Sequence, residues 1–352
     1  MDTGIFGIAG LRNRGNTCYL STSLQCLSHT QLFTNYFISN NYVPDLNNRL
    51  NDLKTQKIKK INEIILTREY AKLIKVLWNS STPIEPKTFH ELIQKYDDRF
   101  AGYEQQDTQE SLALILDYLN EGLKYDVEIN YSGTVENKLD ELVVESCKSW
   151  QTENNNKYSI VIELFFGQFI NKIISQEPSS KGKLVSKKFE MFNMLTVPIH
   201  GLTLYDSLAK YFEKEILETK YLDETTNQYI SAYKEIKLMK VPKYIIIVLK
   251  RYSNNKANVG KSSNIISYPI DDLDLSSYSE GYDKFDCKLR LVSVGCHKGG
   301  GLNGGHYFAI CRHRSGKWYK YDDETVTEFN IMMDKNKLFK DGYLLIYEKN
   351  ES

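Results

Sequence analysis

Apolar residues recur at helical spacing through the first part of the chain. Leucines fall every three or four positions within residues 16–38, which predicts a helix there. Further helices are predicted over residues 69–79, 86–95 and 107–123, and the polar residues 47–60 predict an exposed loop or helix. The first part of the chain is therefore expected to be rich in helices.

The pattern changes near residue 158, after which β-branched and aromatic residues predominate. Strands are predicted over residues 161–174, 189–198, 232–239, 244–250, 289–296, 307–312, 317–322 and 343–348, with a polar loop at 175–188 and a helix at 203–217. Helices followed by strands predict an α+β fold rather than alternating βαβ units. Because neither a repeat nor a long linker interrupts the pattern, we expect a single domain over residues 1–352, with its helical part ending near residue 157.

Composition narrows the class of protein. The 352 residues carry 45 lysines and arginines against 45 aspartates and glutamates, which disfavours nucleic-acid or anionic-membrane partners recognised by bulk charge. No apolar run reaches the roughly 18 residues of a membrane span, and the N-terminus lacks a secretory signal pattern. The six cysteines form no tight pairs, which predicts free thiols in a reducing compartment, cytoplasmic or nuclear.

Cys18 lies at the start of the first predicted helix, directly after a glycine-containing turn at residues 14–17. A helix N-terminus presents unpaired N–H groups and a partial positive charge, which favour thiolate over thiol. Since the thiolate is the working nucleophile, this position suits a catalytic cysteine. The alternative is a buried cysteine that acts as a small apolar residue.

His306 begins a predicted strand and follows Gly304 and Gly305, where another backbone can pass close by. This strand and the next form a predicted hairpin whose turn is Ser315-Gly316. Across the hairpin, Asp322 is placed to orient the imidazole of His306, as the third member of a catalytic triad does. The alternatives are a structural histidine and an acidic turn.

Together these motifs resemble the ubiquitin-specific protease family of cysteine deubiquitinases. The cysteine segment is GLRNRGNTCYLSTSLQCL at residues 10–27, and the histidine segment is residues 304–323. Between them, residues 103–110, 164–169 and 249–252 resemble the family's QQDxxE, LFxGQ and LKRF segments in the same order. A metal-dependent hydrolase is disfavoured because the chain has no HExxH motif.

The resemblance implies roles for five residues. Cys18 corresponds to the nucleophile, His306 to the general base and Asp322 to the acid that orients it, with Asp323 as a possible substitute. Asn13 corresponds to the side-chain amide of the oxyanion hole, where an N–H group stabilises the developing negative charge. The implied reaction is hydrolysis of the isopeptide bond after the C-terminal Gly-Gly of ubiquitin conjugated to lysine.

The resemblance also implies a channel for the tail of ubiquitin. Its expected lining residues are Gln106, Asp107, Tyr252, His297, Gly304, Gly305 and Tyr307. Asp107 also suits the N-cap of the following helix, and exposure of His297 on the surface is a nearly equal alternative to substrate contact. The expected partners are ubiquitin and ubiquitinated proteins, bound by a monomer that needs no cofactor.

Many family members carry two CxxC pairs that resemble a structural zinc site in the β-rich fingers. Here no cysteine lies between residues 147 and 287, so we expect no zinc there, because a closed site needs four ligands. The fingers are then shortened or held by packing, with Phe165, Phe169, Phe189, Met191 and Phe192 as the expected contacts. Ser21 and Ser111 also depart from the family pattern, which has Asn and a bulky apolar residue there.

The implied architecture is a papain-like fold with a helical thumb at about residues 1–157, and fingers and palm at about 158–352. Cys18 and His306 then face each other across the cleft between the two parts. Two alternatives remain open: an inert ubiquitin-binding scaffold on the same fold, and a protease for a ubiquitin-like modifier.

Overall fold

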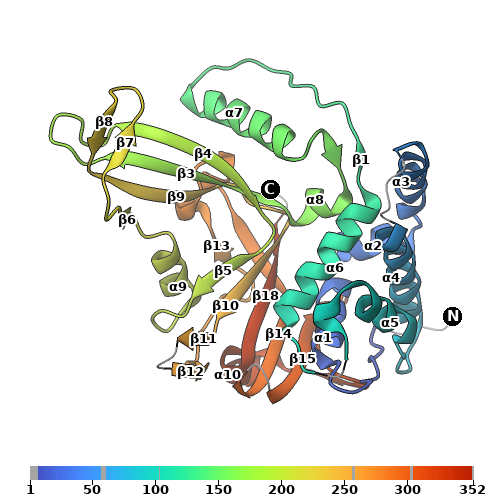
Figure 1. Cartoon of the computed structure of the whole chain (residues 1–352). Helices are drawn as coiled ribbons and strands as arrows, with labels where there is room; N and C mark the ends of the chain where they lie inside the picture. Colours follow the sequence, from blue (N-terminus) through green and yellow to red (C-terminus); the bar gives the residue numbers. More distant parts are fainter. Residues whose placement is uncertain (1–6, 57–60, 103, 256–257, 302–303, 351–352) are drawn as a thin grey trace.

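Helices gather in the first part of the chain and most strands follow, as Figure 1 shows for the computed structural model. The structure describes residues 7–56, 61–102, 104–255, 258–301 and 304–350. Tyr103 of the QQDxxE-like segment and residues 57–60 of the polar segment lie outside the described residues. The α+β order expected from the sequence is confirmed.

Among the described residues up to 123, the α-helices are α1 (Cys18–Ser28), α2 (Gln31–Ile38), α3 (Tyr42–Gln56), α4 (Ile61–Asn79), α5 (Lys87–Tyr96) and α6 (Thr108–Leu123). The prediction of one helix over residues 16–38 was wrong, because the chain breaks between α1 and α2. The hydroxyl of Thr30 donates to the carbonyl of Leu27 (2.6 Å), and Thr30 itself is extended at the N-cap of α2. A side chain that bonds the preceding turn in this way competes with the helical backbone pattern.

Helix α1 is buried along its whole length. Ser23 donates to the carbonyl of Thr108 at the start of α6 (3.1 Å), and Ser293 of β14 (Lys288–Gly301) donates to the carbonyl of Cys26 (3.2 Å). The helix is therefore enclosed by the helical part and by the central sheet. This position sets Cys18 at the junction of the two.

The central sheet has eight strands, in the order β17-β16-β15-β14-β18-β10-β5, with β13 paired to β14. Their bounds are β5 (Leu195–Pro198), β10 (Tyr244–Lys250), β13 (Leu273–Asp274), β15 (Gly304–Arg312), β16 (Trp318–Asp322), β17 (Thr325–Glu328) and β18 (Gly342–Lys349), with β14 as above. Along β10, Ile246 and Val248 join the core of the helical part, whereas Ile245 and Ile247 join the core on the opposite face. This alternation follows from the two-residue period of a strand.

The opposite face of the sheet is covered by α9 (Leu204–Tyr211) and α10 (Ile331–Asp341). Leu208 of α9 and Leu338 of α10 are fully buried in the core there. The predicted helix over residues 203–217 ends early, at Tyr211, and α10 was not predicted.

A second sheet extends away from the first and forms the fingers, at the upper left of Figure 1. Its strands are β4 (Leu184–Phe192), β3 (Gly167–Ser175), β9 (Ala232–Lys240) and β6 (Glu215–Ile216), in that order. A small hairpin, β7 (Tyr221–Asp223) and β8 (Gln228–Ile230), lies at the tip. Helix α7 (Lys138–Glu153), which was not predicted, packs against this sheet through Leu142 and Val143.

The strand predicted over residues 161–174 was wrong at its start, because residues 161–165 belong to helix α8 (Ile160–Phe165) and the strand begins at Gly167. Ser159 caps this helix by accepting a hydrogen bond from the backbone N–H of Ile162 (3.1 Å), a signal the apolar pattern conceals. The polar loop predicted at 175–188 was wrong at its end, because β4 begins at Leu184. The remaining unpredicted pieces are short: β1 (Tyr125–Asp126), β2 (Lys157–Tyr158), β6, β11 (Tyr252–Asn255), β12 (Asn258–Lys261), β13, β17, the β7–β8 hairpin, and the 3₁₀ turns Asp98–Phe100, Ser276–Tyr278 and Tyr282–Lys284.

All six cysteines are free thiols, in agreement with the sequence-based prediction. Within the described residues, no helix combines the length and apolar character needed to cross a membrane.

Candidate active site

Cys18 is the first residue of α1 and is almost completely buried, with 2% of its surface exposed. The turn before it is built from Gly15 (φ +91°) and Asn16 (φ +54°), both in the left-handed region. Thr17, at the N-cap, has no side-chain hydrogen bond to the first turn. The N–H groups of Leu20 and Ser21 bond the carbonyl of Thr17 (3.1 and 3.0 Å), which leaves the first N–H groups of α1 to a negative charge at Cys18.

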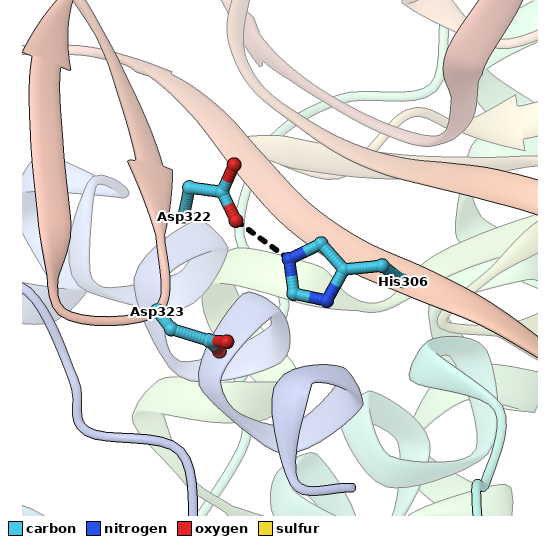
Figure 2. Close-up of side chains that lie close together, drawn as sticks. All are labelled: His306, Asp322 and Asp323. Atoms are coloured by element: carbon cyan, nitrogen blue, oxygen red, sulfur yellow. Dashed lines mark hydrogen bonds and ion pairs between the residues drawn. The ribbon is translucent and has the colours of Figure 1, made fainter.

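His306 and Asp322 meet across the predicted hairpin (Figure 2). Their atoms Nε2 and Oδ1 are 2.6 Å apart. Strands β15 and β16 pair with Ala309 opposite Tyr321, so Asp322 projects on the same face as His306, close to the start of β15. The turn of this hairpin includes Gly316, which has φ +85°, as the sequence predicted.

The charge state of His306 follows from its neighbours. A hydrogen bond with Cys18 and a second with Asp322 raise the pKa of His306 to about 9, although burial acts in the opposite direction. The imidazole is therefore protonated at neutral pH. Because Nε2 bonds Asp322, Nδ1 is the ring nitrogen left to interact with Cys18.

Asn13 is held in one orientation in the loop before Cys18. Its Oδ1 atom accepts hydrogen bonds from the N–H groups of Gly15 (3.0 Å) and Thr17 (3.1 Å) and from the hydroxyl of Thr17 (3.2 Å). Its Nδ2 atom donates to Oδ2 of Asp323 (3.0 Å). An amide nitrogen carries two hydrogens, so a second donor remains for an oxyanion near Cys18.

Asp322 and Asp323 have different partners despite being adjacent. Asp323 has φ +51°, which turns its side chain toward Asn13. Burial raises the pKa of the Asp323 carboxyl, against the hydrogen bond from Asn13, which lowers it. The backbone carbonyl of Asp323 also accepts from the N–H of Leu11 (2.9 Å), which brings the N-terminal loop to this hairpin. Asp323 thus positions Asn13, while Asp322 positions His306.

Replacing Asn13 with alanine is expected to lower kcat by about tenfold or more, with KM nearly unchanged, because an oxyanion donor acts mainly in the transition state. Steady-state hydrolysis of a fluorogenic ubiquitin conjugate measures both constants. Arg12→Ala is the matched control, since Arg12 lies in the same loop with an exposed side chain. A rise in KM with unchanged kcat would place Asn13 in substrate binding instead.

Asp107 joins the helical part to the central sheet. Its Oδ1 atom caps α6 by accepting from the N–H of Gln109 (2.6 Å), and its Oδ2 atom accepts from the hydroxyl of Tyr343 in β18 (2.7 Å). Burial raises the pKa of the Asp107 carboxyl, although both hydrogen bonds lower it. Asp107 can therefore cap α6 with one oxygen while its other oxygen faces the region expected to hold the ubiquitin tail.

His297, Tyr252 and Tyr307 form a single cluster beside Asp107. The hydroxyl of Tyr252 lies 2.7 Å from Nδ1 of His297, and the rings of His297 and Tyr307 are 4.3 Å apart. His297 is fully buried, so the alternative of a surface histidine is wrong. Strand pairing places His297 opposite Tyr307, and this long-range packing removes His297 from solvent.

The glycines before His306 differ in their surroundings. Gly305 has φ +155°, and a Cβ atom there would collide with the ring of His297, so only glycine fits. At Gly304 a Cβ would meet open space. The sequence-based reason for these glycines, close backbone approach, holds at Gly305.

Two residues of this region were not predicted. Gln105 donates from Nε2 to the carbonyl of Gly305 (2.9 Å), which links the helical part to the residue before His306. Tyr343 donates to Asp107, as described above. Gln105 precedes the predicted Gln106 in the same motif, whereas Tyr343 belongs to a strand whose sequence shows only an apolar pattern. The predicted Gln106 is half-buried.

Ser111, a departure from the family pattern, has a partner in the structure. Its hydroxyl lies 2.6 Å from that of Ser23, so the two hydroxyls pair between α6 and α1. Ser21, the other departure, is buried on α1.

The described residues contain one group with metal-ligand spacing: His306, Asp322 and Asp323. Its atoms already serve the hydrogen bonds of the site, with Nε2 of His306 on Asp322 and Oδ2 of Asp323 on Asn13. In the fingers, the residues at the expected zinc position do not suit a thiolate site, because none is cysteine.

Hydrogen bonds hold the fingertip where the family pattern would place zinc. The backbone N–H of Gln176 donates to the carbonyl of Ser231 (2.8 Å), and the N–H of Ser231 donates to Oε1 of Glu177 (2.7 Å). The hydroxyls of Ser175 and Ser180 lie 2.7 Å apart and close the adjoining turn. These contacts join the β3–β4 turn to the start of β9.

Aromatic packing holds the base of the fingers. The rings of Phe169 and Phe192 stack at 4.1 Å, and Phe189 packs in a small core under α7. The sulfur atom of Met191 accepts a hydrogen bond from Nδ2 of Asn154 (3.2 Å). The assignment of Phe165 to the fingers was wrong, because it lies in α8 and packs in the core of the helical part.

We expect the purified protein to contain no stoichiometric zinc. Chelation is expected to leave its melting temperature and its activity unchanged, because a structural zinc site would couple metal removal to unfolding. Elemental analysis and thermal unfolding with and without chelator measure this. About one zinc per chain, with destabilisation on chelation, would contradict the prediction.

Comparison with known proteins places these features in a family. A family model described as ubiquitin carboxyl-terminal hydrolase matches residues 9–347. Ubiquitin carboxyl-terminal hydrolase 2 of Homo sapiens is 30% identical over 354 residues, covering 97% of this chain and 55% of that protein. The probable ubiquitin carboxyl-terminal hydrolase R319 of Acanthamoeba polyphaga mimivirus is 24% identical, covering 98% of this chain and 91% of that protein. This chain thus spans about half the length of the human relative.

A solved structure is similar over the whole chain. It is described as the SAGA Ubp8/Sgf11/Sus1/Sgf73 DUB module bound to ubiquitin aldehyde. The TM-score is 0.73 at 22% sequence identity, and the match covers 100% of this chain and 71% of that one. The papain-like α+β fold expected from the sequence is confirmed.

Proposed function

The chain belongs to the ubiquitin carboxyl-terminal hydrolase family, in its ubiquitin-specific protease type, and we propose that it is a thiol-dependent deubiquitinase. Its reaction is hydrolysis of the isopeptide bond between the C-terminal glycine of ubiquitin and a lysine amine. One observation carries the proposal: Cys18 begins a buried helix that packs on β15, where His306 interacts with the thiol and is oriented by Asp322.

Acylation uses the charge state of the site. Protonated His306 stabilises the thiolate of Cys18, which attacks the carbonyl carbon of the scissile bond. The tetrahedral intermediate places its oxyanion near the N-terminus of α1 and Nδ2 of Asn13. As the C–N bond breaks, His306 transfers its proton to the departing lysine amine, which leaves an acyl-enzyme on Cys18.

Deacylation reverses the roles. Neutral His306 takes a proton from a water molecule, and the hydroxide attacks the thioester carbonyl. The second tetrahedral intermediate collapses to the free carboxylate of ubiquitin, and Cys18 leaves as thiolate. Asp322 keeps Nε2 of the imidazole engaged throughout, so Nδ1 stays directed at the reacting atoms.

The buried cluster beside Asp107 suits an extended tail that ends in Gly-Gly. The two terminal glycines of such a tail have no side chains, so they fit beside the tightly packed Gly305 and His297. Asp107 offers a carboxylate to the backbone N–H groups or basic side chains of such a tail. Tyr252, His297 and Tyr307 supply the walls.

The proposed partners are ubiquitin and ubiquitinated proteins, and we propose that the protein acts as a monomer in the cytoplasm or nucleus. Zero net charge supports recognition by shape and local contacts rather than by bulk charge, and disfavours nucleic acid and membranes as partners. The six free thiols accord with a reducing compartment.

A C-terminal electrophile on ubiquitin tests the proposal, because it forms a covalent adduct only with an activated thiol at the end of the tail channel. We expect one adduct per chain, located at Cys18, and cleavage of diubiquitin. Parallel probes carrying ubiquitin-like bodies test the choice of modifier. Binding without an adduct would favour an inert scaffold, and an adduct only with another modifier would favour a different protease.

A further inference from the structure

Asp322 has a second partner besides His306. Its Oδ1 atom accepts from Nε2 of His306 at 2.6 Å, and its Oδ2 atom forms an ion pair with Nζ of Lys320. Figure 2 shows this other carboxylate oxygen pointing away from the imidazole. The orienting acid is thus held at both oxygens.

We propose that Lys320 is a positioning residue of the catalytic site, whose ammonium group fixes the Asp322 carboxylate in the orientation that directs His306 at Cys18. The proposal rests on the proposed function for its kinetic consequences. Its structural part concerns only how Lys320 acts on Asp322 and, through it, on His306.

Strand geometry brings the two groups together. Lys320 and Asp322 are separated by one residue in β16, so both side chains project from the same face of the sheet. Lys320 lies opposite Ile310 of β15, two residues beyond Phe308. The ammonium group therefore reaches back along the hairpin toward the start of β15, where His306 lies.

The ring of Phe308 restrains Lys320 from a second direction. Nζ of Lys320 lies 4.6 Å from the ring centroid, and Nζ of Lys298 in β14 lies 5.2 Å from the same centroid. A lysine over an aromatic face gains a cation–π interaction that is stronger where water is partly excluded. Lys320 is thus placed between a ring and a carboxylate, rather than free in solvent.

The pair lies at intermediate depth. The side chains of Lys320 and Asp322 are 26% and 31% exposed. Burial alone raises the pKa of the Asp322 carboxyl, but the hydrogen bond from Lys320, followed by that from His306, brings it below its ordinary range. Asp322 therefore stays ionised and accepts at both oxygens, which leaves it little freedom to rotate.

Other charged groups face the same region. Around His306 these are Cys18 of α1, Asp323 in the turn and Lys298 of β14. Lys320 borders a cavity of about 340 Å³ under α10, whose charged lining residues are Lys298, Glu328, Asp334, Lys337 and Asp341. Glu328 pairs with Lys317 (3.0 Å) and Asp334 with Lys337 (2.8 Å), so these carboxylates already have lysine partners.

Two effects of removing Lys320 can be separated. Asp322 would lose one of its two restraints, so His306 would sample orientations that are unproductive for proton transfer, and kcat would fall. A nearby positive charge would also disappear, so the imidazolium would be favoured. The pKa of His306, already raised to about 9, would rise further, and the basic limb of the pH–rate profile would move to higher pH.

Lys320→Met tests the proposal, with Lys320→Arg as rescue and Lys317→Met as control. The control removes Lys317, which directly precedes β16 and pairs with Glu328 instead of Asp322. Hydrolysis of a ubiquitin conjugate from pH 6 to 10 gives kcat and KM. For Lys320→Met we expect kcat lower by about three- to tenfold, KM within about twofold, and the basic limb higher by about 0.5 pH unit.

Lys320→Arg is expected to return the basic limb of the pH–rate profile to its wild-type position and to restore most of kcat. Lys317→Met is expected to match the wild type. High salt should narrow the difference in the basic limb, because the pair is partly exposed. The proposal would be overturned if Lys320→Met had the same kcat as the wild type and the same basic limb of the pH–rate profile. A lower melting temperature without a shift of the limb would reduce Lys320 to a structural role and would overturn it too.

An NMR titration of the His306 ring separates this proposal from the proposed function. The midpoint is expected to rise in Lys320→Met whether or not the protein cleaves ubiquitin conjugates. If the wild type cleaves no ubiquitin conjugate but its His306 titration midpoint depends on Lys320, the proposed function is contradicted and the Lys320 proposal stands. If the wild type is active and His306 has the same midpoint in the wild type and in Lys320→Met, the Lys320 proposal alone is contradicted.

Discussion

Replacing Cys18 with alanine is expected to lower hydrolysis of ubiquitin conjugates by roughly 10⁴-fold or more, because no other group can form the acyl-enzyme. The fold should survive, since the change removes one small side chain at the first turn of α1. The pKa of His306 should fall toward its ordinary value, because the hydrogen bond with Cys18 is the largest of the effects that raise it.

Turnover of a fluorogenic conjugate, binding of ubiquitin by calorimetry and thermal unfolding together measure these effects. Cys147→Ala is the matched control, because Cys147 lies on α7, against the fingers, and is only half-buried. We expect it to keep wild-type turnover. Comparable turnover in Cys18→Ala would disprove the assignment of the nucleophile.

Replacing Arg251 with methionine is expected to lower the free energy of unfolding by about 3 kcal/mol or more, because several carbonyls lose a charged donor and a buried group left unpaired costs ~1–3 kcal/mol. Arg251 is 1% exposed, and burial lowers the pKa of its guanidinium. Its donors meet four backbone carbonyls: Gly342 (2.6 Å), Asn264 (2.7 Å), Phe339 (3.0 Å) and Ser262 (3.4 Å). Methionine would leave the buried carbonyl of Gly342 and three part-buried carbonyls without this donor, and the cost is greatest where water cannot replace it.

The four carbonyls belong to three segments, so the loss should also reach the channel. Phe339 lies near the end of α10, Gly342 begins β18, and residues 262–264 follow the β11–β12 hairpin. Tyr252, which bonds His297, is the residue directly after Arg251. We therefore expect KM for ubiquitin conjugates to rise in any Arg251→Met protein that remains folded.

Denaturant unfolding measures the stability change. Arg312→Met is the matched control, because Arg312 pairs with Asp271 at the surface (2.8 Å), where such pairs contribute about 0–1 kcal/mol. Arg251→Lys should also be destabilised, since an ammonium group cannot reproduce the planar fork. An Arg251→Met protein within about 1 kcal/mol of the wild type would refute the argument.

Local patterns identified elements whose signal lies within the element itself. The strand over residues 244–250 was predicted at the bounds the structure has, because an uninterrupted apolar run is typical of a strand buried on both faces. The hairpin that joins His306 to Asp322 was also predicted, because its turn residues and strands are adjacent in the sequence. Cys18 was placed at a helix start for the same reason.

Errors arose where a single side chain outweighed the periodicity. Ser159 starts α8 inside an apolar run that suggested a strand, and Thr30 separates α1 from α2 inside a helical pattern. A cap or a break depends on one hydrogen bond, whereas apolar spacing averages over many residues. The unpredicted α7 has few buried residues, so its sequence shows little apolar patterning.

The sequence by itself determined the helices-first order, the family, the nucleophile candidate and the histidine hairpin. Only the tertiary structure decided that His297 is buried, that Gln105 reaches Gly305, and that Asn13 pairs with Asp323 across 310 positions. It also assigned the second oxygen of Asp322 to Lys320 and the donors of Arg251 to distant carbonyls. Periodicity reports which face of an element is buried, whereas a contact between distant segments depends on how those faces pack together.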